Sequence, residues 1–184
     1  MKLRVLIPFS AILILSCKTN LKKNEHLVLP GHGFDKLILG ETTKDDLINI
    51  YGENYSIDTF YFQRPFKKEI FSIGVNYKER GIMVAFNQNH KHINGILIKS
   101  PFNAVTKEGI KLNVSTFNDV ERKYGKTKWI LIGHDLTSPE YIGKSYDGIT
   151  FRKKYNGRLT EEALLNKYLN SKVEEIEIHK FRRE

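Results

Sequence analysis

The stretch that decides the fold is Leu39-Gly-Glu-Thr-Thr-Lys-Asp-Asp-Leu-Ile-Asn-Ile-Tyr-Gly52, which returns 73 residues later as Leu112-Asn-Val-Ser-Thr-Phe-Asn-Asp-Val-Glu-Arg-Lys-Tyr-Gly125. The two copies share the same leucine, threonine, aspartate, tyrosine and glycine at the same spacing. Self-similarity at a fixed offset is the sequence signature of a duplicated structural unit. We therefore predict two copies of one unit.

Each copy has the pattern of a short capped helix. Thr43 and Thr116 precede the helix, and the aspartate three residues later completes a capping box with aspartate in place of glutamate. Gly52 and Gly125 follow the last helical residue, where a left-handed C-cap is expected. A helix of about eight residues is too short to be stable alone, so each helix must pack against a sheet.

The segments after each helix alternate between apolar and polar residues, as half-buried strands do. The pattern covers Phe71–Tyr77 and Ile82–Phe86 in the first copy, and Ile149–Phe151 and Val173–Phe181 in the second. A continuous apolar run begins at Trp129 and is typical of a central strand. We expect an α+β fold of two tandem repeats, each a short helix plus a three- or four-stranded antiparallel sheet, with the helices on one face.

The N-terminus has the features of an export signal. Lys2 and Arg4 precede an uncharged apolar stretch from Val5 to Leu15. As a helix this stretch spans about 16 Å, roughly half of a hydrocarbon core of about 30 Å. Ile14-Leu15-Ser16-Cys17 then resembles the lipobox of bacterial lipoproteins, which implies cleavage before Cys17 and lipidation of Cys17 with acyl chains such as palmitate.

The cysteine count agrees with this resemblance, because Cys17 is the only cysteine in the chain. The alternative is a free thiol after an ordinary signal peptide, which is a liability in an oxidising compartment. We divide the chain into a signal peptide (1–16), a lipidated flexible tether (17–26), a first repeat (27–105) and a second repeat (106–184). Lys18 is not the aspartate associated with inner-membrane retention in some bacteria, and this favours the outer membrane.

The chain carries a formal net charge of +9, but its basic residues are scattered in short pairs and triplets. A nucleic-acid-binding protein concentrates such residues on one element with aromatic residues between them. We therefore expect no nucleic-acid partner. The charge is better explained by solubility beside a membrane and weak attraction to anionic lipid or glycan.

The duplicated motif also resembles a known group of proteins. Gly40-Glu-Thr-Thr-Lys-Asp-Asp-Leu with Tyr51-Gly52, and Val114-Ser-Thr-Phe-Asn-Asp-Val with Tyr124-Gly125, are similar to the repeats of the beta-lactamase inhibitor protein and of the small outer-membrane lipoproteins of the barrel-assembly machinery. The resemblance implies a tandem helix-plus-sheet fold and a general habit of binding proteins. It identifies no partner, and Asn113 departs from the glycine found at Gly40.

An aromatic-rich run supplies the candidate partner-binding residues. The candidates are Tyr61, Phe62, Arg64 and Phe66, together with Trp129 outside the run. Aromatic and arginine side chains dominate the energetics of protein interfaces. The same pattern also fits packing within a strand and core, and the sequence leaves both interpretations open.

Catalytic and metal-binding patterns are weak. His90 and His92 are alternate residues, but they lie between two strand patterns, with no acidic residue or cysteine nearby to complete a metal site. Asp46 already has a capping role, and adjacent helix residues such as Asp45 do not face it. Ser145, His134 and Asp135 lack the context of a nucleophile. Gly31-His-Gly33 lacks the Lys-Ser/Thr of a phosphate-binding loop.

We therefore expect a non-catalytic, membrane-anchored lipoprotein that binds another protein of the cell envelope. The partner would belong to an envelope assembly, or it would be an exported enzyme or toxin that this chain inhibits. No cofactor or metal is expected. The alternatives are a cell-wall or glycan-processing enzyme, and a protein that binds a small ligand in the concavity of its sheet.

Overall fold

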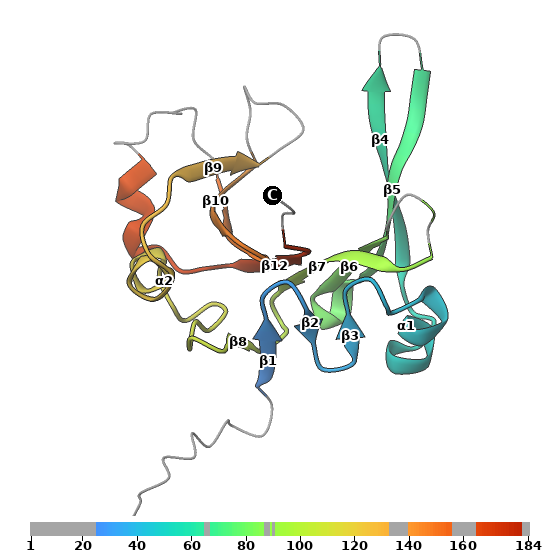
Figure 1. The fold of residues 1–184 in the computed structure, drawn as a ribbon, viewed down its shortest axis with the longest axis horizontal. Helices are drawn as coiled ribbons and strands as arrows, with labels where there is room; N and C mark the ends of the chain where they lie inside the picture. Colours follow the sequence, from blue (N-terminus) through green and yellow to red (C-terminus); the bar gives the residue numbers. More distant parts are fainter. Residues whose placement is uncertain are drawn as a thin grey trace, which may run out of the picture.

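A computed structural model describes residues 25–64, 67–86, 89, 91–132, 140–155 and 165–181. The described strands form two sheets (Figure 1). The smaller sheet has the order β3 (Leu37–Ile38), β2 (Gly33–Phe34), β1 (His26–Leu29), β8 (Ala104–Thr106). The larger sheet has the order β4 (Ser56–Arg64), β5 (Lys67–Tyr77), β6 (Ile82–Phe86), β7 (Ile93–Lys99), β12 (Glu175–His179), β11 (Ile149–Lys154), β10 (Tyr141–Tyr146), β9 (Trp129–Ile132).

Four helical segments complete the described structure. They are the α-helices α1 (Lys44–Tyr51) and α2 (Phe117–Tyr124) and the 3-10 helices η1 (Lys78–Arg80) and η2 (Asn166–Asn170). The signal peptide, Cys17 and the tether up to residue 24 lie outside the described residues, so their predictions stay predictions. His26, placed in the tether above, is the first residue of β1.

The predicted fold class is wrong. The described chain is mostly β, and its strands form two open sheets of four and eight strands instead of two helix-plus-small-sheet repeats. The reason is the pairing of β7 with β12, from Lys99↔Glu175 to Gly95↔His179, which joins the strands after both helices into one sheet. The four-stranded sheet was missed because its strands, two to four residues long, are too short to show a period.

Trp129 also lies in a different strand environment from the predicted one. Its apolar run forms β9, which pairs with β10 from Trp129↔Lys144 to Ile132↔Tyr141 and ends the sheet order among the described strands. A continuous apolar run is therefore an edge strand here, not a central one. Side chains from neighbouring elements, not a second flanking strand, account for the burial of Trp129.

The capping boxes are confirmed at both helices. The Thr43 hydroxyl accepts the Asp46 N–H at 3.2 Å, and the Asp46 carboxylate accepts the Thr43 N–H at 2.8 Å. The second helix has the same two bonds at the same distances, between Thr116 and Asp119. Both capping glycines have a positive φ (86° and 90°), but their ψ values are extended, so the chain leaves each helix without the predicted left-handed cap.

The two copies of the motif also attach to the strands by equivalent bonds. The Gly40 N–H donates to the Ile93 carbonyl at 2.7 Å, and the Ile93 N–H donates to the Thr42 carbonyl at 3.0 Å. The second copy has the same pair of bonds at 2.8 and 2.9 Å, made by Asn113, Val173 and Ser115. The residue correspondence between the copies therefore holds at the level of single hydrogen bonds.

The core lies between the inner face of the large sheet, the two α-helices and the small sheet. Its fully buried members include Val84 and Ile98 of the large sheet, Leu47 of α1, Val120 of α2 and Val28 of the small sheet. Full burial of such a side chain contributes about 1.5–3 kcal/mol. This core holds both sheets and both helices together as one packed unit.

Candidate functional site

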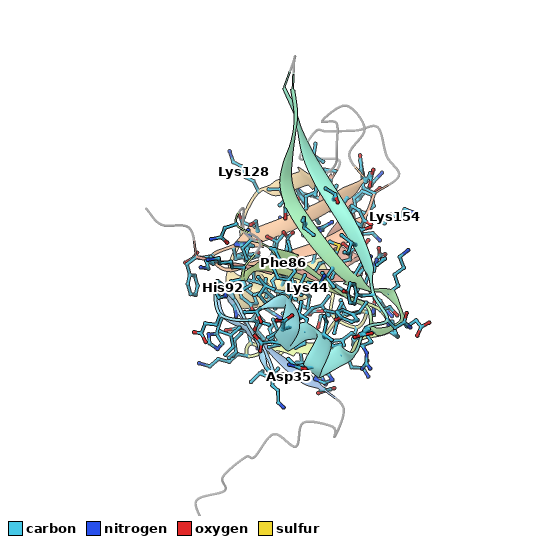
Figure 2. The ribbon with its side chains drawn as sticks, turned by 90° about the vertical axis from the view of Figure 1, so that its right-hand side faces the viewer. Asp35, Lys44, Phe86, His92, Lys128 and Lys154 are labelled. Atoms are coloured by element: carbon cyan, nitrogen blue, oxygen red, sulfur yellow. The ribbon has the colours of Figure 1, made fainter. Side chains whose placement is uncertain are left out.

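The β4–β5 hairpin projects from the body of the protein, as Figure 1 shows and as Figure 2 shows from a view turned by 90°. The two strands pair from Ser56↔Asn76 to Arg64↔Lys67, with a register shift at Phe60/Tyr61. β5 pairs with β6 only from Gly74 to Tyr77. The outer part of the hairpin is therefore a two-stranded ribbon whose backbones, among the described strands, pair only with each other.

β4 is an edge of the large sheet among the strands that the structure describes. It is nine residues long, so one row of backbone N–H and C=O groups along it has no described strand beside it. Natural proteins usually keep edge strands short or cover them, because an open edge is a template for pairing with another chain. A long open edge is the structure that a partner uses when it binds by adding a strand.

Three of the predicted partner-binding residues lie on this strand by their backbone positions: Tyr61, Phe62 and Arg64. Their side chains, and Phe66 as a whole, lie outside what the structure describes. Ile57 is the described apolar side chain on β4 that is exposed, with 54% of its surface accessible. It was not singled out from the sequence, because an isolated isoleucine in a strand pattern normally faces the core.

Trp129 lies elsewhere, in the core. It is 8% exposed, its ring centroid is 4.9 Å from that of Phe117, and its Nε1–H donates to Asn166 Oδ1 at 3.2 Å. The Lys144 ammonium lies 4.4 Å from the centroid of the indole ring. We therefore leave Trp129 out of the partner-binding surface considered below.

Three tyrosines fix the base of the hairpin to α1. Tyr51 and Tyr55 pack against Tyr77, at centroid distances of 5.3 and 5.7 Å. The Tyr77 hydroxyl donates to the Gly52 carbonyl at 3.1 Å. Burial raises the pKa of Tyr77 above its ordinary value. These contacts hold the hairpin in a fixed direction relative to the core.

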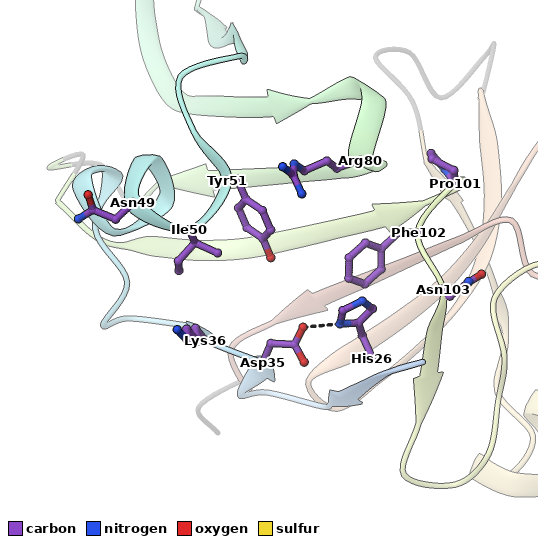
Figure 3. Close-up of a pocket in the computed structure, with 10 residues that line it drawn as sticks. All are labelled: His26, Asp35, Lys36, Asn49, Ile50, Tyr51, Arg80, Pro101, Phe102 and Asn103. Atoms are coloured by element: carbon purple, nitrogen blue, oxygen red, sulfur yellow. Dashed lines mark hydrogen bonds and ion pairs between the residues drawn. The ribbon is translucent and has the colours of Figure 1, made fainter. Parts of the chain in front are cut away.

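A groove of about 800 Å³ lies between α1, the small sheet and the loop that follows β7 (Figure 3). The His26 ring nitrogen Nδ1 is hydrogen-bonded to the Asp35 carboxylate, and the same ring stacks on Phe102 at a centroid distance of 4.3 Å. Tyr51 forms the facing wall, with the Arg80 guanidinium 5.4 Å from its ring centroid. Burial, with a smaller contribution from the Asp35 charge, raises the pKa of Tyr51 to about 12.

The sequence did not indicate this groove. His26, Asp35 and Arg80 are spread over 54 positions and form no recognisable motif. They meet because β1 pairs with β2, which precedes the turn at Asp35, while η1 delivers Arg80 beside the last turn of α1. Asp35 has a positive φ of 48°, a conformation that aspartate tolerates better than most residues, but an aspartate in the sequence alone predicts no site.

The weaker sequence candidates take structural roles where they are described. His92 Nδ1 lies 2.8 Å from the Glu41 carbonyl oxygen, and Ser145 Oγ lies 2.9 Å from Thr150 Oγ1. His90, His134 and Asp135 lie outside the described residues. Among the described residues, no group of three or more His, Cys, Asp or Glu could hold a metal ion.

No protein-family model, curated protein or solved structure matches this chain. The resemblance to the beta-lactamase inhibitor protein and the barrel-assembly lipoproteins therefore stays a prediction. Within the part of the chain that the structure describes, no helix has the length and hydropathy needed to cross a membrane.

Proposed function

We propose that this chain is a lipid-anchored envelope protein that binds a protein partner through the β4–β5 hairpin. The partner would add an extended segment to the open edge of β4. The observation that carries the proposal is the hairpin itself, a nine-residue edge strand in a ribbon that projects beyond the sheet (Figure 1).

The low intrinsic stability of a projecting ribbon supports this proposal. A two-stranded ribbon is at best marginally stable in water, and an open edge favours aggregation. The sequence nevertheless places Phe60, Tyr61 and Phe62 on the projecting part of β4, and Arg64 at its end. Aromatic and arginine side chains of this kind supply most of the binding energy in protein interfaces. A partner strand would satisfy the backbone of β4 and cover this segment at once.

The position of the anchor fits the same proposal. Eight residues lie between Cys17 and His26, so the nine Cα–Cα steps of the tether reach at most about 30 Å. The start of β1 and the outer end of the hairpin lie at opposite ends of the molecule (Figure 1). A chain anchored at its N-terminal side can therefore present its hairpin on the side away from the membrane, where a partner can reach it.

The enzyme alternative has less to support it in the described structure. Hydrolysis of a glycosidic bond usually requires two carboxyl groups flanking that bond. Asp35 is the acidic residue among those described as lining the groove of about 800 Å³, and it is hydrogen-bonded to His26. We therefore propose the binding function alone.

The test compares the wild-type lipoprotein with two lysine variants in its own cells. Ile57→Lys places a charge on the edge strand, at a side chain that is 54% exposed, while Val114→Lys makes the same change at a side chain that is 65% exposed on another part of the surface. Proteins crosslinked to the wild type would be identified by mass spectrometry, purified and titrated against all three forms. We expect one stoichiometric partner whose affinity falls at least about tenfold with Ile57→Lys and is unchanged with Val114→Lys.

Hydrogen exchange then locates the contact. Addition of a strand slows amide exchange along Ser56–Arg64 when the purified partner binds, because its carbonyls accept the open N–H groups of β4. A partner that protects other segments and leaves β4 unchanged would disprove the edge-strand mode. If the only crosslinked protein were a second copy of this chain, the hairpin would serve self-association and not an envelope partner.

A further inference from the structure

The groove beside α1 is a second feature, separate from the open edge of β4. Its volume of about 800 Å³ lies within the range of small-molecule sites, about 300–1,000 Å³. Its walls come from β1, the β2–β3 turn, the last turn of α1, η1 and the loop after β7 (Figure 3). None of these walls belongs to the projecting part of the hairpin.

The walls are flat and largely apolar. The His26 and Phe102 rings stack with an interplanar angle of 28°, and Phe34 packs against Phe102 at a centroid distance of 5.1 Å. On the other side stand the Tyr51 ring and the Ile50 side chain. The Tyr51 ring is held by Tyr77, and the His26 ring by Asp35. Rings that are already fixed by their neighbours lose little freedom when a ligand packs against them.

The charge of the groove is positive. Asp35, its acidic side chain, is engaged by His26. Lys36 and Arg80 also line the groove, and within the part of the chain that the structure describes neither is ion-paired with a carboxylate. The Arg80 guanidinium lies against the Tyr51 ring, 5.4 Å from its centroid. A guanidinium stacked on an aromatic ring keeps its N–H donors free for a carboxylate or phosphate.

We propose that this groove binds a small aromatic acid, a flat ring that bears a carboxylate or phosphate group. The acid group pairs with Arg80, with Lys36 as the second cation, and the ring packs between Tyr51 and Phe102. A neutral analogue lacks the charge-assisted hydrogen bonds, and a cationic analogue is repelled by both basic residues.

The test uses ligand-observed saturation-transfer NMR on the full lipidated protein in nanodiscs, with protein-free nanodiscs as the blank. The probes are benzoate and phenyl phosphate, with benzamide and benzamidine as neutral and cationic analogues built on the same ring. The variant is Arg80→Gln, and its control is Lys78→Gln, which removes the same charge from the same 3-10 helix at a residue outside the groove. Circular dichroism of each variant is the control for folding.

We expect saturable transfer to benzoate and phenyl phosphate. The dissociation constant of both acids should rise about tenfold with Arg80→Gln and stay unchanged with Lys78→Gln. Lys36→Gln should weaken both acids by a smaller factor. Equal binding of benzamide and benzoate, equal losses in the Arg80 and Lys78 variants, or no saturation up to about 10 mM would each overturn the proposal. None of these outcomes depends on the hairpin, so the groove and the protein-binding proposal succeed or fail separately.

Discussion

A single backbone angle explains why Asn113 replaces glycine in the second copy of the motif. Asn113 has a φ of 59°, and Gly40, its counterpart, has a φ of 85°. Left-handed backbone is costly for most residues, while asparagine tolerates it better because its side chain can hydrogen-bond locally. The departure from glycine at this position is therefore a substitution that keeps a positive φ.

This reasoning predicts opposite outcomes for two substitutions at Asn113. Asn113→Ala should lower the free energy of unfolding by about 1 kcal/mol, because alanine pays the left-handed cost without compensation. Asn113→Gly should change it by no more than a few tenths of a kcal/mol. Urea denaturation of the three proteins measures both values. An alanine variant as stable as the wild type would show that the backbone relaxes out of this conformation.

The proximity of the groove residues could not be predicted from the sequence. By sequence His26 falls in the predicted tether, and Arg80 belongs to no recognisable motif, because each residue is unremarkable beside its sequence neighbours. Their proximity depends on the pairing of β1 with β2 and on the position of η1 against α1. Neither contact has a local sequence signal. The capping threonines were predictable because their partners lie three residues away.

At the scale of elements, α2 carries a titratable cap. The Thr116 N–H and the Thr116 hydroxyl both donate to the Asp119 carboxylate. These two bonds, the N–H bond more strongly, hold the pKa of Asp119 below its ordinary value. Arg122 also pairs with this carboxylate. A group whose pKa is lower in the folded state contributes stability above its unfolded pKa, about 3.9, and loses that contribution as the pH falls through the folded pKa.

We therefore expect the stability difference between the wild type and Asp119→Asn to depend on pH. The wild type should be more stable by about 1 kcal/mol near neutral pH, the usual contribution of a helix cap. The difference should shrink below about pH 4, as Asp119 becomes protonated. Urea denaturation of both proteins over this range measures it, and the other carboxylates cancel in the comparison. If the difference in unfolding free energy between the two proteins stayed constant with pH, the stabilisation would come from the shape of the Asp119 side chain and not from its charge.

The strands were harder to place than the helices. The alternating pattern located β6, because every second residue there is buried against the core. It could not show that the strands after both helices share one sheet, because the edges that meet, β7 and β12, are set by long-range contacts. The alternating pattern also could not show that the outer part of the hairpin projects from the sheet, because the pairing of backbone groups leaves no periodic pattern in the sequence.

At the scale of the whole molecule, the central pair β7 and β12 joins residues 27–105 to residues 106–184. Five residue pairs connect the two strands, and Ile98 and Ile176 are both fully buried. Unfolding either side exposes the inner strand of the other. Domains built around one continuous core usually unfold in a single transition.

We accordingly expect residues 27–105 and 106–184 to unfold together. Trp129, the single tryptophan, reports the second half by fluorescence, while hydrogen exchange at β6 reports the first. Both probes should give one coincident denaturation curve. Ile98→Ala should lower the common midpoint, with a loss of about 2–5 kcal/mol. Two separate transitions would show that the predicted repeats are independent domains after all.

The parallel pairing of β1 with β8 has a mechanical consequence. The chain enters β1 at His26, which is aligned with Ala104, and the next two residues of β1 align with Val105 and Thr106. A pull from the N-terminal side, opposed by a partner that holds the distant hairpin, runs along β1. Under the proposed function, such a load would stretch the inter-strand hydrogen bonds together in shear instead of peeling them apart one by one, so β1 would bear the tension.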